Sequence, residues 1–166
     1  MHTDRFLMAV VLAAVLASGP VGCRKETSRW EAADQATRGA TDAVSERAVD
    51  GSVFNRFFPK EEGDYDLVFK QEKQGFAQAS LQQDGKELAV LSVMDTRSNP
   101  AARDKFANAA DNVAGYPVVE AGERTHALLV ANRFQVQIQS VDPAFGKSAR
   151  LEWLGKFDLA GIAEIE

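Results

Sequence analysis

The sequence predicts an α+β domain in which two βββα repeats form a mostly antiparallel sheet of about six strands covered by two helices. Short apolar runs alternate with polar residues, a helical stripe follows the third run of each half, and the two halves correspond at a fixed spacing. The chain has 166 residues, of which 45% are hydrophobic and 26% are charged. This length and balance predict one domain, residues 51–166, with N-terminal appendages.

An aromatic cluster in "SVFNRFFP" begins the predicted domain. Phe54, Phe57 and Phe58 recur at helical spacing, and Pro59 ends the segment. We expect a short helix that closes one end of the core. An exposed aromatic patch for a partner is the alternative interpretation.

Six runs with the character of strands follow this helix. Asp84-Gly85 and Asn132-Arg133 each separate two runs, which predicts hairpins at these positions. The third run is apolar on both faces, as a central strand is. In the sixth run glutamines alternate with apolar residues, so we expect one face of the sheet to be exposed to water. The runs are "YDLVFK", "FAQASLQQ", "ELAVLSVMD", "GYPVVEA", "THALLVA" and "FQVQIQSV".

A predicted helix follows the third strand of each half. Asn99-Pro100 is typical of an N-cap followed by a proline at the first helical position. Residues 147–156 predict the second helix, in which Leu151 and Leu154 lie one turn apart, and "FDLAGIAEI" predicts a frayed helical tail. The apolar stripe of the first helix is Phe106, Ala109, Ala110 and Val113.

A shift of 47 residues aligns the two halves without a gap and predicts an internal repeat at residues 65–113 and 112–160. The shift places Asp95 on Asp142 and Arg103 on Arg150, each pair at the same point of its unit. Further matches are Gly75 with Gly122, Leu81 with Leu128, Lys86 with Arg133, Ala102 with Ala149, Phe106 with Trp153 and Asp111 with Asp158.

The N-terminal segment has the features of an export signal over residues 1–22. The run "FLMAVVLAAVLA" spans residues 6–17 without a charge. Twelve apolar residues suit a signal-peptide core and fall short of the about 20 that a membrane-spanning helix needs. An uncleaved membrane anchor is the alternative.

The end of this segment, Pro20-Val21-Gly22-Cys23, resembles the lipobox of bacterial lipoproteins. The resemblance covers residues 1–23, and Pro20 stands where the family has leucine. It implies cleavage before Cys23, a diacylglycerol on the Cys23 sulfur and a further acyl chain on the new amine, which together anchor a protein stably to a membrane. Arg24 follows the cysteine instead of aspartate, which implies the periplasmic side of the outer membrane in a host with two membranes.

Secretion with cleavage after Gly19 is the competing interpretation, and it would leave Cys23 as a free thiol. The chain contains one cysteine, so a disulfide within the chain is excluded. Residues 23–50 are rich in alanine and charged residues and predict a lipidated, flexible spacer. Fully extended, it would span roughly 90 Å.

Candidate site residues are few. Arg103 and Arg150, related by the repeat, are the predicted ligand-binding residues, because paired arginines can hold a carboxylate or phosphate. Salt bridges from them to Asp95 and Asp142 are the alternative, and both aspartates are expected in turns or caps. His126 is expected to be a hydrogen-bonded core residue. We expect no catalytic residue, metal site or cofactor.

The predicted function is that of a membrane-anchored envelope lipoprotein with a non-enzymatic interaction or structural domain, attached through Cys23 and contacting another envelope protein. A net charge of −5 argues against nucleic acid as a partner. The alternative is a module that binds a small molecule, lipid or peptide on the sheet or in a groove between the repeats. A hydrolase that uses clustered carboxylates, such as those of Glu61 and Glu62, is a third and weaker hypothesis.

Overall fold

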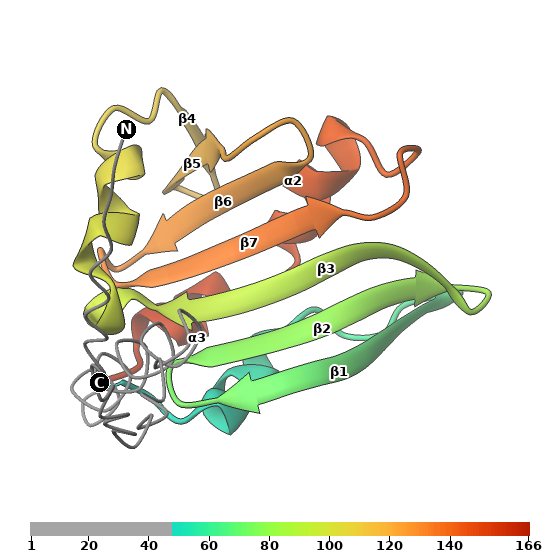
Figure 1. Ribbon diagram of the computed structural model, residues 1–166, viewed down its shortest axis with the longest axis horizontal. Coiled ribbons are helices and arrows are strands. Elements are labelled where there is room, and N and C mark those ends of the chain that lie inside the picture. The colour runs from blue at the N-terminus through green and yellow to red at the C-terminus, as the bar shows by residue number, and fades with distance from the viewer. Residues whose placement is uncertain (1–47) are drawn as a thin grey trace, which may run out of the picture.

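The computed structural model describes residues 48–166, so the predicted signal peptide, Cys23 and most of the predicted spacer lie outside the described residues. The domain is α+β, with one antiparallel sheet of seven strands in the order β1-β2-β3-β7-β6-β5-β4 (Figure 1). The strands are β1 (Tyr65–Lys73), β2 (Phe76–Gln83), β3 (Lys86–Asp95), β4 (Asp111–Val113), β5 (Tyr116–Glu120), β6 (Thr125–Val130) and β7 (Phe134–Ser140).

Five short helices of the described domain accompany the sheet. Within residues 48–166, no helix has the length and apolar character needed to cross a membrane. The helices are the 3₁₀ segments η1 (Gly51–Phe57), η2 (Thr96–Ser98) and η3 (Pro100–Phe106), and the α-helices α2 (Lys147–Gly155) and α3 (Leu159–Ala163).

The main core lies between the sheet and the helices η1, α2 and α3, which cover one face (Figure 1). In β7 the inward positions Phe134, Val136 and Ile138 are fully buried and alternate with glutamines, as a strand with one covered face requires. On the opposite face, the helices of residues 48–166 form a second, smaller buried cluster over β6, where Phe106 of η3 packs on Ala127 and Leu129.

The aromatic segment at the start of the domain confirms its prediction. The carboxylate of Asp50 accepts a hydrogen bond from Ser52 N–H and caps η1. Phe54 is fully buried and meets the ring of Phe134 edge-on, with the ring centroids 5.9 Å apart. Gly51 lies so close to the backbone of Lys73 that a side chain has no room there. The helix therefore fits tightly against the β1–β2 hairpin.

The helix predicted after Asn99-Pro100 is wrong in its second half. The 3₁₀ helix η3 ends at Phe106, and Asp111–Val113 instead form β4, the seventh strand. The reason is a hairpin turn after Val113, which the apolar stripe of the predicted helix did not indicate. Ala114 and Gly115 both have positive φ, 52° and 86°, and form a two-residue hairpin that pairs β4 with β5.

The chain end also differs from its prediction. The segment 157–165 was expected to fray, but Leu159 and Ile162 of α3 are buried in the core. Asp158 caps this helix by accepting a hydrogen bond from Gly161 N–H at 2.9 Å. The second predicted helix is confirmed as α2, and the Asp84-Gly85 hairpin is confirmed between β2 and β3.

The prediction of two βββα repeats over about six strands is therefore not confirmed. The first half does not end in one helix but in η2, η3 and β4. A correspondence at 47 residues nevertheless holds in the central strands. Ala79 pairs with Leu91, and His126, 47 residues after Ala79, pairs with Ile138, 47 residues after Leu91. The third strands of the two halves, β3 and β7, lie side by side, and Leu91 pairs with Ile138 between them.

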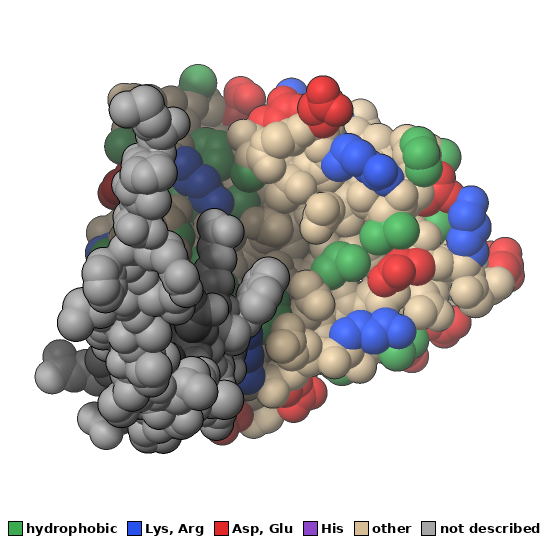
Figure 2. All heavy atoms as spheres, viewed as in Figure 1, with side chains coloured by type: hydrophobic (Ala, Val, Ile, Leu, Met, Phe, Trp, Pro, Cys, Tyr) green, Lys and Arg blue, Asp and Glu red, His purple; other side chains and the backbone are tan. Residues whose placement is uncertain are grey.

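The uncovered part of the sheet forms a second surface, which we call the open face. Figure 2 looks onto it and shows a broad band of uncharged polar side chains and backbone between scattered charged groups. Strand pairing orders its side chains in cross-strand rows, because residues opposite one another share a face. The rows are Gln78–Ser92–Gln137, Ser80–Val90–Gln139 and Phe76–Met94–Gln135.

Candidate functional site

Arg150 is buried, with 5% of its surface exposed, and its guanidinium donates hydrogen bonds into the end of the sheet. Nε donates to Nδ1 of His126 at 2.9 Å, and Nη1 donates to Oγ of Ser140 at 2.8 Å. Longer bonds of 3.4 Å run to the carbonyl oxygens of Phe145 and Glu123. All four acceptors are uncharged, and none of the carboxylates in residues 48–166 forms an ion pair with Arg150.

His126, on β6, is the buried partner of this guanidinium and confirms the prediction of a hydrogen-bonded core histidine. Burial lowers the pKa of His126, and the nearby positive charge of Arg150 lowers it further. Because Nδ1 accepts a hydrogen bond from Arg150, it cannot carry a proton in this arrangement. The network therefore requires a neutral histidine.

The helix α2 holds Arg150 in place and begins without a cap. Gly146 occupies the N-cap position and has no side chain to accept the first backbone N–H groups. The first turn of α2 contains no acidic residue, whereas Lys147 stands at its first position. The positive end of the helix dipole thus lies among basic side chains.

A depression of about 390 Å³, here called the α2 pocket, opens beside this helix start. Arg124 and Lys147 line it together with Arg150, and Glu123 contributes the one carboxylate of the lining. Arg124 donates a hydrogen bond to the carbonyl oxygen of Val141. The remaining lining residues are Ser140, Pro143, Phe145 and Gly146.

Arg103 lies elsewhere. Its guanidinium donates to the carbonyl oxygens of Pro100, at 3.3 Å, and Asn132, at 3.1 Å. It borders a separate open groove of about 820 Å³ between η3 and the strands β5 and β6, with Phe106 and Tyr116 among the lining residues.

The two predicted ligand-binding arginines do not share a groove. Arg103 contacts Asn132, just before β7, and Arg150 contacts Ser140, the last residue of β7. At about 3.3 Å per residue these ends of β7 lie roughly 20 Å apart. No groove between repeats joins them, so each arginine is considered by itself.

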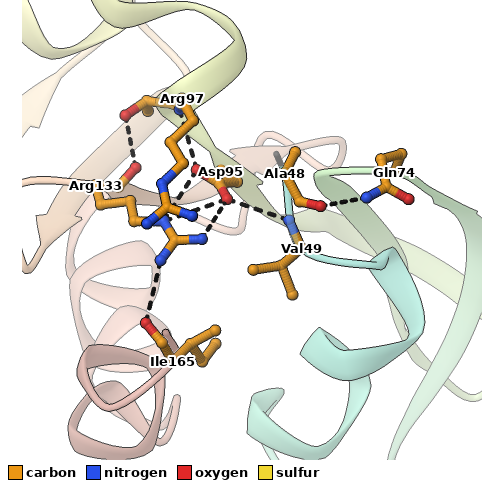
Figure 3. A network of polar contacts seen from close by, with 8 residues as sticks. Ala48, Val49, Gln74, Asp95, Arg97, Arg133 and Ile165 are labelled. Atoms are coloured by element: carbon orange, nitrogen blue, oxygen red, sulfur yellow. Dashed lines mark hydrogen bonds and ion pairs between the residues drawn. The ribbon is translucent and has the colours of Figure 1, made fainter. Parts of the chain in front are cut away.

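A further buried charged group, Asp95, was expected only as a turn or cap residue. Its carboxylate accepts hydrogen bonds from the backbone N–H of Arg97 at 3.0 Å and of Val49 at 3.3 Å (Figure 3). Arg133 pairs with the same carboxylate, with Nη2 2.8 Å from Oδ2. Neither Arg103 nor Arg150 reaches it.

The Asp95–Arg133 pair connects segments from both ends of the domain. Nη1 of Arg133 also donates to the carbonyl oxygen of Ile165 at 3.2 Å, next to the C-terminus (Figure 3). Val49, bound to Asp95, is among the first described residues. Burial raises the pKa of Asp95, but hydrogen bonds from Arg133, Arg97 and Val49 outweigh this effect and hold the pKa below its ordinary value.

The same arrangement recurs 47 residues along the chain. Asp142 accepts a hydrogen bond from the N–H of Ala144 at 2.8 Å and forms an ion pair with Lys86. These residues correspond to Asp95, Arg97 and Arg133 through the 47-residue shift. The expected turn and cap roles of both aspartates are confirmed, since Asp95 is the N-cap of η2 and Asp142 accepts from Ala144. The alternative of salt bridges to Arg103 and Arg150 is wrong, although the shift does match Lys86 with Arg133.

The remaining candidates are the acidic residues Glu61 and Glu62 and the predicted lipidation site Cys23. Glu61 and Glu62 are exposed, and their loop brings them beside Lys156, which binds Glu62 at 3.2 Å. Within residues 48–166 no group of three histidine, cysteine or acidic side chains is arranged to hold a metal ion. Cys23, the predicted lipidation site, lies outside the described residues.

Comparison of the chain with protein-family models, with curated proteins and with solved structures gives no match.

Proposed function

We propose that this protein is a membrane-anchored lipoprotein of the bacterial envelope, attached through acyl chains on Cys23, whose domain binds another envelope protein through the open face of its sheet. The domain acts without catalysis, and the spacer of residues 23–50 carries it away from the membrane. The pattern before Cys23 supports the anchor, and the open face supports the interaction.

The composition of the open face is the observation that carries the interaction. Sheet faces exposed to water commonly carry charged side chains, whereas the centres of protein interfaces are depleted in them. Across β2, β3 and β7 the rows of the open face consist of glutamine, serine, valine, methionine and one phenylalanine, Phe76, and none of them is charged. Ser80, Ser92 and Gln135 are themselves buried in these rows. Glutamine offers both donors and acceptors, so this surface suits a partner that presents backbone or amide groups.

The attachment of the spacer also supports a tethered domain. Val49 is held by two hydrogen bonds, donating to Asp95 and accepting from Gly75 N–H at 2.6 Å. Asp95 in turn belongs to β3, a central strand of the sheet. A force applied to the spacer would therefore be transmitted to a central strand of the sheet. It would not first separate an edge strand from the sheet.

The anchor is tested with Cys23→Ser. We expect this variant to lose incorporation of labelled palmitate and to leave the membrane fraction, with the wild-type chain as the reference. A Cys23→Ser protein that keeps its label and stays with membranes would overturn the anchor. Release of the wild-type chain as a soluble protein beginning at Pro20 would favour secretion with cleavage after Gly19.

The interaction is tested with a photo-crosslinking amino acid in living cells. Placed at Gln137, in the middle of the open face, it should trap one discrete protein partner. The matched control places it at Glu152, which is exposed on α2 and belongs to the helical side of the domain. Equal crosslinking from both positions, or none from Gln137, would contradict the proposed face.

A narrower form of the internal repeat is also proposed. Residues 76–95 and 123–142 would derive from one duplicated segment. The matching pairings of Ala79 with Leu91 and of His126 with Ile138 support it, as do the ion pairs of Asp95 and Asp142.

A further inference from the structure

We infer that the α2 pocket binds the phosphate group of a soluble phosphorylated solute. This site lies apart from the open face and needs neither the proposed anchor nor the proposed protein partner in order to bind. The inference rests on a buried and unneutralised guanidinium, on two further basic side chains in the same depression, and on the uncapped start of α2.

The charge of Arg150 is the central observation. A guanidinium has five N–H groups, and the four hydrogen bonds of Arg150 go to uncharged acceptors. One N–H of Nη2 has no acceptor among the described residues, although Arg150 is 5% exposed and lines the α2 pocket. A buried positive charge without a counter-charge is unfavourable, and an anion in the pocket would supply that counter-charge.

The surroundings add positive charge where a helix start already carries it. Lys147 occupies the first position of α2, and Arg124 lies across the depression on the turn before β6. Basic residues are usually placed at the opposite end of a helix, because the N-terminus has a partial positive charge. The carboxylate of Glu123 is exposed and forms no ion pair with Arg150. Asp142, which is paired with Lys86, also lies near Arg124, so the two carboxylates offset part of this positive charge.

The arrangement of donors favours a phosphate over a carboxylate. The basic lining residues come from two separate elements, Arg124 from the turn before β6 and Lys147 and Arg150 from α2. The uncapped backbone N–H groups of the helix start provide a further set, as in many phosphate sites. A tetrahedral oxyanion can use donors from several directions, whereas a planar carboxylate uses mainly those in one plane. The volume of about 390 Å³ suits a small group.

The position of the pocket favours a soluble source over a lipid headgroup. The spacer joins the domain at Val49, beside Asp95 and Arg133, near the start of β7. The pocket lies at Ser140, the other end of β7, which is roughly 20 Å away. This choice of source rests on the proposed anchor, because the spacer, roughly 90 Å long when fully extended, would hold the domain away from the lipid headgroups.

Calorimetric titration of the full chain in detergent with inorganic phosphate tests the site. Sodium chloride at matched ionic strength serves as the reference. We expect saturable binding of phosphate that weakens at least tenfold in Arg124→Gln/Lys147→Gln. The control Lys60→Gln/Lys70→Gln removes the same charge from exposed lysines outside the pocket and should bind as the wild type does. Phosphate binding no different from chloride, or binding unchanged in the pocket variant, would overturn the site.

Further variants test the chemistry without risk to the fold. Glu123→Gln removes the one carboxylate of the pocket and should tighten phosphate binding severalfold, and unchanged or weaker binding would contradict the site. Thermal unfolding of each variant shows that it is folded before its phosphate binding is compared.

Further titrations test which phosphate-bearing molecule the pocket binds. Glycerol phosphate should bind at least as well as phosphate, and acetate should bind at least tenfold more weakly; acetate binding of equal strength would overturn the choice of phosphate. Phosphatidylglycerol incorporated into the detergent micelles should not compete, and competition that depends on Arg124 and Lys147 would overturn the soluble source. Cys23→Ser should bind phosphate like the wild type, so a failure of the anchor leaves this site intact.

Discussion

Arg133 holds the buried carboxylate of Asp95 through three nitrogen–oxygen contacts, with Nε 3.2 Å from Oδ1 and 3.3 Å from Oδ2, and Nη2 2.8 Å from Oδ2. Arg133 also contacts the face of Phe134, with its guanidinium carbon 4.4 Å from the ring centroid. Because Asp95 is fully buried, its charge depends on this partner and on the backbone N–H groups around it.

Replacing Arg133 by Gln should lower the free energy of unfolding by about 3 kcal/mol, because it leaves the carboxylate of Asp95 buried without its counter-charge. Lys86→Gln is the matched control at the corresponding position of the other half, where the lysine side chain is 70% exposed. It should cost less than about 1 kcal/mol. Urea unfolding of both variants at pH 7 measures the difference, and equal losses would show that burial does not separate the two pairs.

The stability contributed by Asp95 should depend on pH. The pKa of Asp95 lies below its ordinary value in the folded state, so the unfolded state binds the proton first as pH falls. The contribution is therefore complete above the unfolded pKa of about 3.9 and is lost as pH falls through the lower, native pKa. Asp95→Asn should be less stable than the wild type at pH 7, and this difference should shrink as pH falls from about 4 to 3. A constant difference in thermal unfolding across that range would contradict the prediction.

His126 should give a second pH dependence, at higher pH. Burial and the charge of Arg150 lower its pKa in the folded state, so the unfolded state binds a proton more readily below the ordinary pKa of about 6.5. Stability should therefore rise as pH increases from about 5 to 7. His126→Gln should remove most of this slope, because an amide oxygen can still accept from Arg150 and does not titrate. An NMR titration of His126 with a pKa at or above 6.5 would disprove the account.

Much of the fold could be predicted because apolar alternation reports directly on sheet faces. All six predicted strand runs are present, and the glutamines of β7 face away from the core as expected. The seventh strand was missed because Asp111–Val113 is only three residues long, and a helical stripe through Val113 fits the same letters. Its hairpin turn begins with Ala114 at positive φ. Alanine is not among the residues that indicate such a turn in a sequence.

The candidate site was harder to predict than the fold, because it depends on which residues meet across the sheet. Sequence identity under the 47-residue shift singled out Arg103 and Arg150 as a pair, yet equivalent positions in two antiparallel halves lie at opposite ends of the central strands. The same geometry explains why Asp95 meets Arg133. The strands β3 and β7 run in opposite directions, so the end of one lies beside the start of the other.

The turn between β4 and β5 gives a further testable prediction. Ala114 and Asp84 each precede a glycine in a two-residue hairpin and have nearly the same φ, 52° and 51°. A positive φ is costly for alanine, whereas aspartate tolerates it through local hydrogen bonds. Ala114→Gly should therefore stabilise the β4–β5 hairpin by roughly 0.5 kcal/mol, after the greater freedom of glycine in the unfolded chain is subtracted.

The matched control, Asp84→Gly, should bring little or no gain. Hydrogen exchange at the amides of β4 and β5 measures the local change, and slower exchange only in Ala114→Gly is the expected result. Faster exchange in that variant would mean that the turn does not strain Ala114.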